Sequence, residues 1–252
     1  GEFGKVVKIN YNNKFYALKI GEKINIKYES EIYKKLRGFN NISNIYDLFE
    51  TENLFCLLLD YYHMNLTQYK TQFYNSINYE KNLLNNIVDL CNIIKFIHSN
   101  EIIHRDLKPT NICLNTNYKL YLIDFGISKI YMNKNKHIEE KKIKSIIGSV
   151  NFSSLNVINL IEPSRRDDIE SILFIFLYMI LNNNYYVAYN NLDNYKKKDI
   201  LIIINVLKLQ YDDTNFDFSI FEKLFNYIRR VKFNQEPNYS YIVTLVTKIF
   251  SC

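Results

Sequence analysis

The chain has 252 residues, 48% of them hydrophobic, which is enough to bury a core and excludes a wholly disordered protein. Its four cysteines form no CxxC pair and its four histidines show no ligand spacing near them, so neither a disulfide framework nor a zinc site is indicated. The net charge of +6 leaves two interpretations of the lysine-rich stretches open, a solvated surface or an attraction for acidic substrates.

Nothing in the sequence indicates secretion or a membrane anchor. No basic-then-apolar leader opens the chain. The longest apolar run, Ile172–Leu181, has ten residues, where a bilayer-spanning helix needs roughly 20. We therefore expect this run to be a buried core helix, and we expect a reducing, cytoplasmic location, with the nucleus as an alternative.

The first sixty residues predict short strands interrupted by one helix. Alternating residues and an Asn-rich turn at Tyr11–Asn13 predict a hairpin. Tyr28, Ile32 and Leu36 recur on one helical face and Gly38 follows them, which predicts a helix over residues 27–36. The predicted strands are Lys5–Asn10, Lys14–Ile20, Ile45–Glu50 and Leu54–Asp60.

After about residue 64 the periodicity becomes helical. The predicted helices are Tyr79–Ser99, Asp167–Leu181, Asp199–Leu209, Ser219–Arg230 and Tyr239–Phe250, and two short strands are expected around Ile112–Leu114 and Lys119–Ile123. The sequence thus predicts an α+β fold, with a small β-rich lobe over residues 1–61 and a larger, mainly helical lobe over residues 62–252. No internal repeat or low-complexity tail is evident.

Two linked motifs lie around the predicted short strands. His104–Asn111 reads HRDLKPTN, and Asp124–Gly126 reads DFG after the next strand. In order and separation they resemble the catalytic loop and the metal-binding loop of the protein kinases. The alternative, that Asp106 and Asp124 are ordinary loop-capping carboxylates, explains only single positions and not the linked pattern.

The kinase resemblance assigns a role to each polar residue of these motifs. Phosphoryl transfer needs a group that accepts the proton of the attacking hydroxyl and cations that neutralise the phosphate oxygens. Asp106 is expected to orient and deprotonate the substrate hydroxyl, and Lys108 to reach the γ-phosphate of ATP, as in serine/threonine kinases. Asn111 and Asp124 offer the oxygen ligands that Mg²⁺ prefers.

The small lobe supplies the expected nucleotide-binding residues. Ala17–Ile20 resembles the strand that carries the ATP-binding lysine, here Lys19, and Glu29 on the following helix would pair with it. The hinge that would bind adenine through its backbone aligns with Asp60, Tyr61 and Tyr62, and Leu59 would line the back of the pocket.

The start of the chain resembles the second half of a glycine-rich loop. Gly1, Phe3, Gly4 and Val6 would cover the phosphates, while the first glycine of the pattern is absent. We therefore expect a trimmed N-terminus.

The later part of the sequence resembles the casein-kinase-one group and the vaccinia-related kinases. The usual Ala-Pro-Glu triplet is missing, and Gly148–Ser154 (GSVNFSS) and Glu162–Ser171 (EPSRRDDIES) take its place. By this resemblance Asp168 would bind the backbone of the catalytic loop, with Arg166 as structural support. A carboxylate favoured by the helix dipole is the simpler alternative for Asp168.

One departure from the casein-kinase-one pattern affects substrate recognition. Members of that group carry an anion-binding arginine where this chain has Asn151. Recognition of substrates that already bear a phosphate is therefore not expected. Abundant Lys, Asn, Ile and Tyr suggest AT-rich codons, as in a large DNA virus, whose kinase would act in the host cytoplasm, or in a parasite.

The sequence as a whole predicts an active serine/threonine kinase that uses ATP and Mg²⁺. Its expected partners are protein substrates, which could be acidic, and we expect a monomer with no requirement for nucleic acid or a membrane. A pseudokinase that binds partners without transfer is the second hypothesis, although Lys19, Asp106 and Asp124 are all present. A nucleic-acid-binding role has only the basic charge in its favour.

Overall fold

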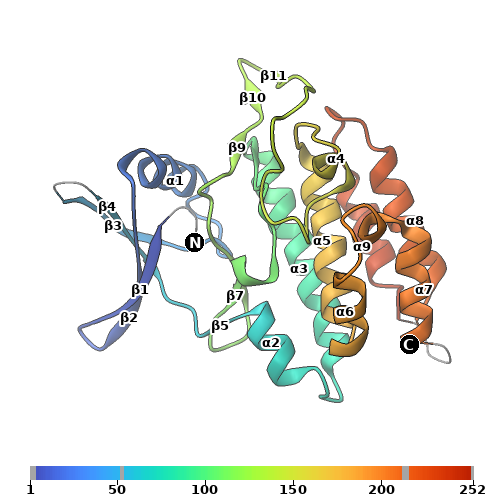
Figure 1. The fold of residues 1–252 in the computed structure, drawn as a ribbon. Coiled ribbons are helices and arrows are strands. Elements are labelled where there is room, and N and C mark those ends of the chain that lie inside the picture. Colours follow the sequence, from blue (N-terminus) through green and yellow to red (C-terminus); the bar gives the residue numbers. More distant parts are fainter. Residues whose placement is uncertain (1–3, 52–53, 212–215, 251–252) are drawn as a thin grey trace. The chain divides into compact units, whose positions relative to one another are not determined.

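The computed structural model describes residues 4–51, 54–211 and 216–250, and Figure 1 shows their helices and strands. The chain divides into two compact units. The first contains the chain up to Gln68 together with Pro109–Lys129, and the second contains Tyr69–Lys108 and the chain from Ile130 onwards. The segment with Asn111 and Asp124 therefore belongs to the first unit, whereas Asp106 and Lys108 belong to the second. The lobe boundary predicted after residue 61 stays a prediction.

The main sheet of the first unit is four-stranded and antiparallel, in the order β1-β2-β4-β3. Its strands are β1 (Lys5–Tyr11), β2 (Lys14–Gly21), β3 (Ile45–Glu50) and β4 (Phe55–Asp60). Asn12 and Asn13 join the first two with φ of 49° and 59°, which is the positive-φ geometry of the two-residue hairpin turns that asparagine tolerates. The predicted hairpin and strand pair are confirmed, with ends that differ by one residue.

Helix α1 (Lys23–Lys35) packs against β2, β3 and β4. It begins four residues before the start of the predicted helix, because Ile26, which is fully buried, extends its apolar face toward the N-terminus. No side chain caps its start, so the capping signal on which a sequence prediction depends is missing. Gly38 follows the helix with φ of +98°, a conformation that favours glycine.

The rest of the first unit positions the expected metal-binding loop. Strands β5 (Met64–Asn65), β7 (Ile112–Leu114) and β8 (Leu120–Leu122) form a second antiparallel sheet, preceded at β7 by the 3₁₀ turn η1 (Pro109–Asn111). The apolar residues of β7 and β8 are buried, and the amide of Leu122 donates to the carbonyl of Asn41. The two predicted short strands are thereby confirmed.

Helices dominate the second unit. The long ones are α3 (Tyr79–Ser99), α5 (Arg165–Ile180), α7 (Ile200–Gln210) and α8 (Phe218–Arg230), followed by α9 (Tyr239–Val246). Helix α5 is the buried core helix that the apolar run predicts, and it packs against α3 and α8. Within residues 4–51, 54–211 and 216–250, no helix is both long and apolar enough to cross a bilayer.

Several elements are absent from the sequence prediction because they are too short to show a clear period. They are α2 (Leu66–Phe73), α4 (Leu155–Ile158), α6 (Asn183–Asn190), the 3₁₀ turn η2 (Lys196–Lys198) and strands β6 (Ile102–Ile103), β9 (Lys129–Ile130), β10 (Met132–Asn133) and β11 (Lys136–His137). The predicted last helix is also too long, since α9 ends at Val246 rather than at Phe250.

Candidate functional site

One face of the four-stranded sheet carries the residues expected to contact the nucleotide. Val6 lies opposite Lys19, and Ala17 lies opposite Leu59. Since residues two apart on a strand share a face, these four side chains lie on the same side of the sheet. Val6 is more than half exposed, as a covering residue needs to be.

Gly4 leads into this face at a position that only glycine fits. Its φ is +142°, and a Cβ atom there would lie 2.4 Å from the carbonyl oxygen of Ile20. The second glycine of the expected loop is thus required for the backbone to approach β2. Gly1 and Phe3, the other residues expected in that loop, lie outside the described residues.

Lys19 is held between two carboxylates inside the first unit. Its Nζ lies 2.7 Å from Glu29 Oε2 and 2.7 Å from Asp124 Oδ1. Lys19 and Glu29 are buried, whereas the Asp124 side chain is one-third exposed. Burial alone would lower the pKa of Lys19, but the two carboxylates outweigh it and the pKa is raised. The ammonium group is therefore charged and fixed in place, as an ion pair to a phosphate requires.

Asp124 stands at a sharp bend beside this ion pair. Its φ is +66°, and its amide donates to the hydroxyl of Tyr33 at 3.1 Å. A Cβ atom on Gly126 would come within 3.3 Å of Asp124 Oδ1 and 3.7 Å of Lys19 Nζ. The glycine after Phe125 therefore leaves room for the charged groups, which explains the DFG pattern locally.

The donor set of the first unit suits a magnesium ion bound with a nucleotide. Asn111 is buried at the end of η1, and its carbonyl accepts the amide of Ile123, which precedes Asp124. An amide oxygen and a partly exposed carboxylate are hard ligands that leave positions for water and phosphate oxygens. Asn111 and Asp124 are the residues that would hold the ion.

The expected hinge begins at Asp60, the last residue of β4. The side chains of Asp60 and Tyr62 both contact other side chains of the first unit. The carboxylate of Asp60 accepts hydrogen bonds from the amide and side chain of Asn44 and from the hydroxyl of Tyr46, all between 2.7 and 2.9 Å. The ring of Tyr62 stacks on Tyr121 at 4.6 Å between centroids. The adenine contact that we expect of their main chain stays a prediction.

In the second unit, hydrogen bonds from Ser149 and Lys108 place the carboxylate of Asp106. Its Oδ1 accepts from the amide of Ser149 at 2.9 Å and from the Ser149 hydroxyl at 2.8 Å. Its Oδ2 lies 2.7 Å from Lys108 Nζ. Gly148 makes this approach possible, because its φ is +78° and a Cβ there would lie 2.3 Å from the carbonyl oxygen of Arg105. The carboxylate is thus oriented on one side by the segment after Gly148.

Ser149 was not among the expected site residues. It lies 43 positions after Asp106 in the sequence, and the only sequence signal was its place directly after Gly148 in the GSVNFSS string. Its hydroxyl donates to Asp106 Oδ1 and is therefore placed to fix the orientation of this carboxylate.

Asp168 braces the catalytic loop from the first turn of α5. Its two oxygens accept hydrogen bonds from the amides of His104 and Arg105, at 2.8 and 2.9 Å, which is the contact that the resemblance predicts. Its Oδ2 also lies 2.9 Å from His98 Nε2, and His98 Nδ1 lies 2.7 Å from the hydroxyl of Tyr239. Burial lowers the pKa of His98, so its ring is neutral and donates its one proton to Asp168.

Although burial opposes it, these donors hold the pKa of Asp168 below its usual value. The carboxylate therefore stays charged and keeps hold of the two loop amides. Arg105 has a φ of +70°, a conformation that costs free energy in a non-glycine residue and persists only where neighbouring contacts fix it. Asp168 and Gly148 supply such contacts.

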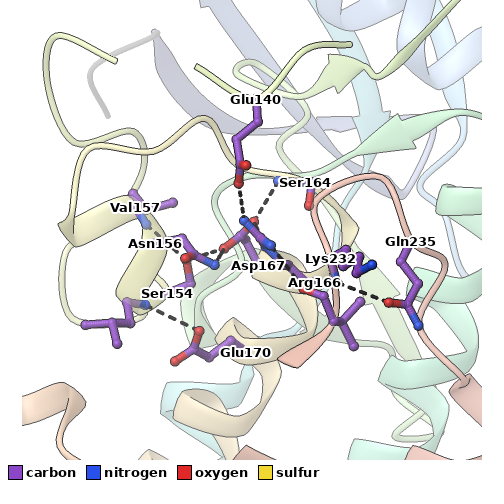
Figure 2. A network of polar contacts seen from close by, with 12 residues as sticks. Glu140, Ser154, Asn156, Val157, Ser164, Arg166, Asp167, Glu170, Lys232 and Gln235 are labelled. Atoms are coloured by element: carbon purple, nitrogen blue, oxygen red, sulfur yellow. Dashed lines mark hydrogen bonds and ion pairs between the residues drawn. The ribbon is translucent and has the colours of Figure 1, made fainter. Parts of the chain in front are cut away.

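A second polar network joins the segment after β11 to α4 and α5 (Figure 2). Arg166 contacts Glu140 at 2.7 Å and donates to the carbonyl of Val231 at 3.0 Å. Asp167, next to it, is buried and accepts from the Ser154 hydroxyl and the Ser164 amide. Burial raises the pKa of Asp167 to about 6 against these hydrogen bonds. Arg166 thus ties the first turn of α5 to Glu140 and to the carbonyl of Val231.

The segment that carries Glu140 is also tied down by its backbone. The amide of Ile143 donates to the carbonyl of Leu160, and the amide of Glu162 donates to the carbonyl of Lys141. Ser154 caps α4 by accepting from the amide of Val157. Ordinary hydrogen bonds and the half-exposed ion pair of Glu140 with Arg166 therefore help to hold this part of the chain.

We expect Glu140→Gln to loosen this segment without unfolding the protein. The ion pair with Arg166 is half exposed on the Glu140 side, so its loss should cost about 1 kcal/mol or less of unfolding free energy. Hydrogen exchange should speed up at the amides of Ile143 and Glu162, while those of α3 stay as protected as before. Unchanged exchange at both amides would show that the backbone pairing holds the segment without the ion pair.

Asn151 occupies the position where the casein-kinase-one pattern has an anion-binding arginine. Lys197 Nζ donates to its side-chain oxygen at 3.1 Å, and Lys198 Nζ donates to its carbonyl at 2.9 Å. Both lysines are buried, and burial lowers the pKa of Lys198 to about 7. The weak recognition of phosphate-bearing substrates that the sequence suggests stays a prediction.

Comparisons with known proteins agree with the motifs. Residues 1–247 match the family described as protein kinase domain. The chain is also similar to a probable casein kinase I homolog of Encephalitozoon cuniculi, with 31% identity over 99% of this chain and 82% of the relative.

Proposed function

The chain belongs to the protein kinase family, and from this premise we propose that it transfers the γ-phosphoryl group of ATP to serine and threonine hydroxyls of proteins, as a casein-kinase-one-like enzyme. The observation that carries the proposal is the setting of Asp106, which the Ser149 hydroxyl and Lys108 hold at hydrogen-bonding distance. Lysine at the position of Lys108 is typical of serine/threonine kinases.

The proposed reaction assigns one task to each charged group. The substrate hydroxyl loses its proton to Asp106 as its oxygen bonds to the γ-phosphorus, and the bond from that phosphorus to the β-phosphate oxygen breaks to leave ADP. Lys108 neutralises charge on the transferring oxygens, and Lys19, fixed by Glu29, binds the α- and β-phosphates. Bound Mg²⁺, held by Asn111 and Asp124, would add Lewis-acid charge neutralisation.

Transfer to a mixed protein substrate tests the proposal directly. The purified chain is incubated with magnesium, γ-labelled ATP and casein, and the labelled residues are identified after acid hydrolysis. We expect phosphoserine and phosphothreonine, and none in the same sample made with Asp106→Ala. Label on tyrosine alone would contradict the substrate class. Nucleotide binding without any transfer would favour a pseudokinase.

We further propose that the enzyme needs no phosphorylation of its own activation segment. Between Gly126 and Gly148 the hydroxyl residues are Ser128, Tyr131 and Ser145. The first two are buried, and only Ser145 is exposed. The ion pair between Glu140 and Arg166 already gives this segment the charged contact that a phosphate elsewhere creates.

Phosphatase treatment should therefore leave the activity unchanged within about twofold. The measurement compares initial rates before and after treatment, with intact mass confirming that phosphate was removed. Ser145→Ala serves as the matched variant, and loss of most activity in either sample would overturn the proposal.

A further inference from the structure

A series of buried hydrogen bonds leads from helix α9 to the catalytic loop within the second unit. The hydroxyl of Tyr239 lies 2.7 Å from His98 Nδ1, and His98 Nε2 lies 2.9 Å from Asp168 Oδ2. Asp168 in turn accepts from the amides of His104 and Arg105. Tyr239, His98 and Asp168 are at most 5% exposed. Each of these polar groups therefore depends on its neighbour in the series rather than on bulk water.

Tyr239 is the first residue of α9, and several contacts fix the start of this helix. The side chain of Asn238 caps the helix by accepting from the amide of Tyr241 at 3.0 Å. The amide of Asn238 donates to the hydroxyl of Tyr227 at 2.8 Å. Helix α9 also packs against α3 and α8. The ring of Tyr239 is thereby held beside His98, which lies in the last turn of α3.

The direction of each hydrogen bond follows from the protonation states of the three side chains. Asp168 is charged, because its donors hold its pKa below the usual value, and a carboxylate can only accept. Burial lowers the pKa of His98, so the single proton of its neutral ring lies on Nε2, which faces Asp168. Burial also raises the pKa of Tyr239 far above its usual value. Its hydroxyl therefore keeps its proton and donates to Nδ1.

The Tyr239 hydroxyl supports one of the two neutral forms of the His98 ring. With the proton on Nδ1, the lone pair of Nε2 would face the Asp168 carboxylate at 2.9 Å, and Asp168 would lose a donor. With the proton on Nε2, the lone pair of Nδ1 needs a donor, which is the Tyr239 hydroxyl. Without that hydroxyl, the favourable form would bury an acceptor that has lost its partner. The ring would then turn or move its proton, and Asp168 would be held less firmly.

We propose that Tyr239 is a positioning residue for phosphoryl transfer: its hydroxyl keeps the His98 proton on Nε2, and His98 in turn keeps Asp168 oriented toward the catalytic loop. The proposal rests on the proposed function, which makes Asp106 the base. Arg105, one of the two residues whose amides Asp168 binds, has a φ of +70° and directly precedes Asp106. Relaxation of this strained residue would displace the base.

Steady-state kinetics test the effect on transfer. Tyr239→Phe keeps the ring and removes the hydroxyl, and Tyr241→Phe makes the same change two residues further along α9, where the ring packs against Tyr227. We expect Tyr239→Phe to lower kcat about tenfold, because a buried acceptor loses its donor. The KM for ATP should stay within about twofold, since Lys19 belongs to the first unit and is not altered. An unchanged kcat in Tyr239→Phe, or an equal loss in Tyr241→Phe, would overturn the proposal.

Nitrogen NMR of the histidine rings gives a readout that a merely structural role would not move. A ring nitrogen with a proton and one with a lone pair resonate far apart, so the spectrum reports the tautomer directly. The His98 ring is identified by its through-space contact with the ring of residue 239, which lies 5.9 Å away between centroids in the wild type. We expect the wild-type proton on Nε2 and a mixture of both tautomers in Tyr239→Phe. A wild-type proton on Nδ1, or an unchanged tautomer in Tyr239→Phe, would contradict the proposal.

Tyr131→Phe is a second matched variant for the NMR measurement. The Tyr131 hydroxyl donates to the backbone carbonyl of His98 at 2.6 Å, so this substitution removes a buried hydrogen bond from the same residue without touching its ring. The His98 tautomer should stay on Nε2. A change as large as in Tyr239→Phe would assign the effect to general loosening and refute the role of Tyr239. Because the spectra need no transfer, they decide that role even if the wild-type chain proves inactive, a result that would refute the proposed function instead.

Discussion

Asp106→Asn should lower kcat by about 10²- to 10⁴-fold, the usual contribution of a positioned general base, with further loss from misplaced substrate. The substitution keeps the size of the side chain and an oxygen that can accept from Ser149. It removes the negative charge that Lys108 faces at 2.7 Å and the basicity that accepts the hydroxyl proton. The measurement is single-turnover transfer at saturating ATP, which reports chemistry rather than product release.

Nucleotide affinity provides the control for Asp106→Asn. Lys19, the residue expected to bind the phosphates, is held by Glu29 and is not altered by this substitution, so the dissociation constant for ATP should stay within about twofold of the wild type. Ser149→Ala is a milder variant for comparison. It removes the hydrogen bond from the hydroxyl to Asp106 but keeps the hydrogen bond from the backbone amide of residue 149. Full activity in Asp106→Asn would remove Asp106 as the base and, with it, the proposed mechanism.

Lys19→Met should abolish most of the activity and also destabilise the protein, for two separable reasons. Activity falls because the ammonium group that would bind the phosphates is gone, a loss of about 10²- to 10³-fold by analogy with other preorganised charges. Stability falls because Glu29, which is 1% exposed, loses its partner at 2.7 Å. Breaking a buried ion pair in this way costs about 3 to 5 kcal/mol. Urea unfolding and transfer rates measure the two effects.

The double variant Lys19→Met with Glu29→Gln separates the loss of activity from the loss of stability. A neutral glutamine tolerates burial, so most of the lost unfolding free energy should return while the activity does not. Recovery of activity in the double variant would show that Lys19 acts only by supporting the fold. Asp124, whose side chain is one-third exposed, can stay hydrated without Lys19 and needs no compensating change.

The stability deficit of Lys19→Met should also depend on pH. Burial raises the pKa of Glu29, while the attraction of Lys19 lowers it, so removing Lys19 raises this pKa further. When folding raises the pKa of a carboxyl group, the protein loses stability as pH rises from the pKa of the unfolded state to that of the folded state. The reason is that folding disfavours the charged form of the group. The deficit should therefore be smaller at pH 5 than at pH 8. An equal deficit at both values would mean that Glu29 is not the source.

The sequence by itself determined the family, the fold class and the order of the functional groups. HRDLKPTN and DFG are contiguous strings whose residue types are dictated by phosphoryl transfer, so they can be recognised without any structure. The asparagine turn at Asn12 and Asn13 and the ten-residue apolar run of α5 are likewise local signals. The hairpin and the buried helix that they predict were both confirmed.

Only the tertiary structure decided which distant residues serve these groups. Ser149 reaches Asp106 from 43 positions away, and His98 reaches Asp168 from 70 positions away. Lys119 and Gly38 line the same pocket although β3, β4, α2 and α3 lie between them in the sequence. Such contacts depend on how helices and strands pack against one another. The periodicity of a segment shows which of its faces is buried, but it does not identify the segment that packs against that face.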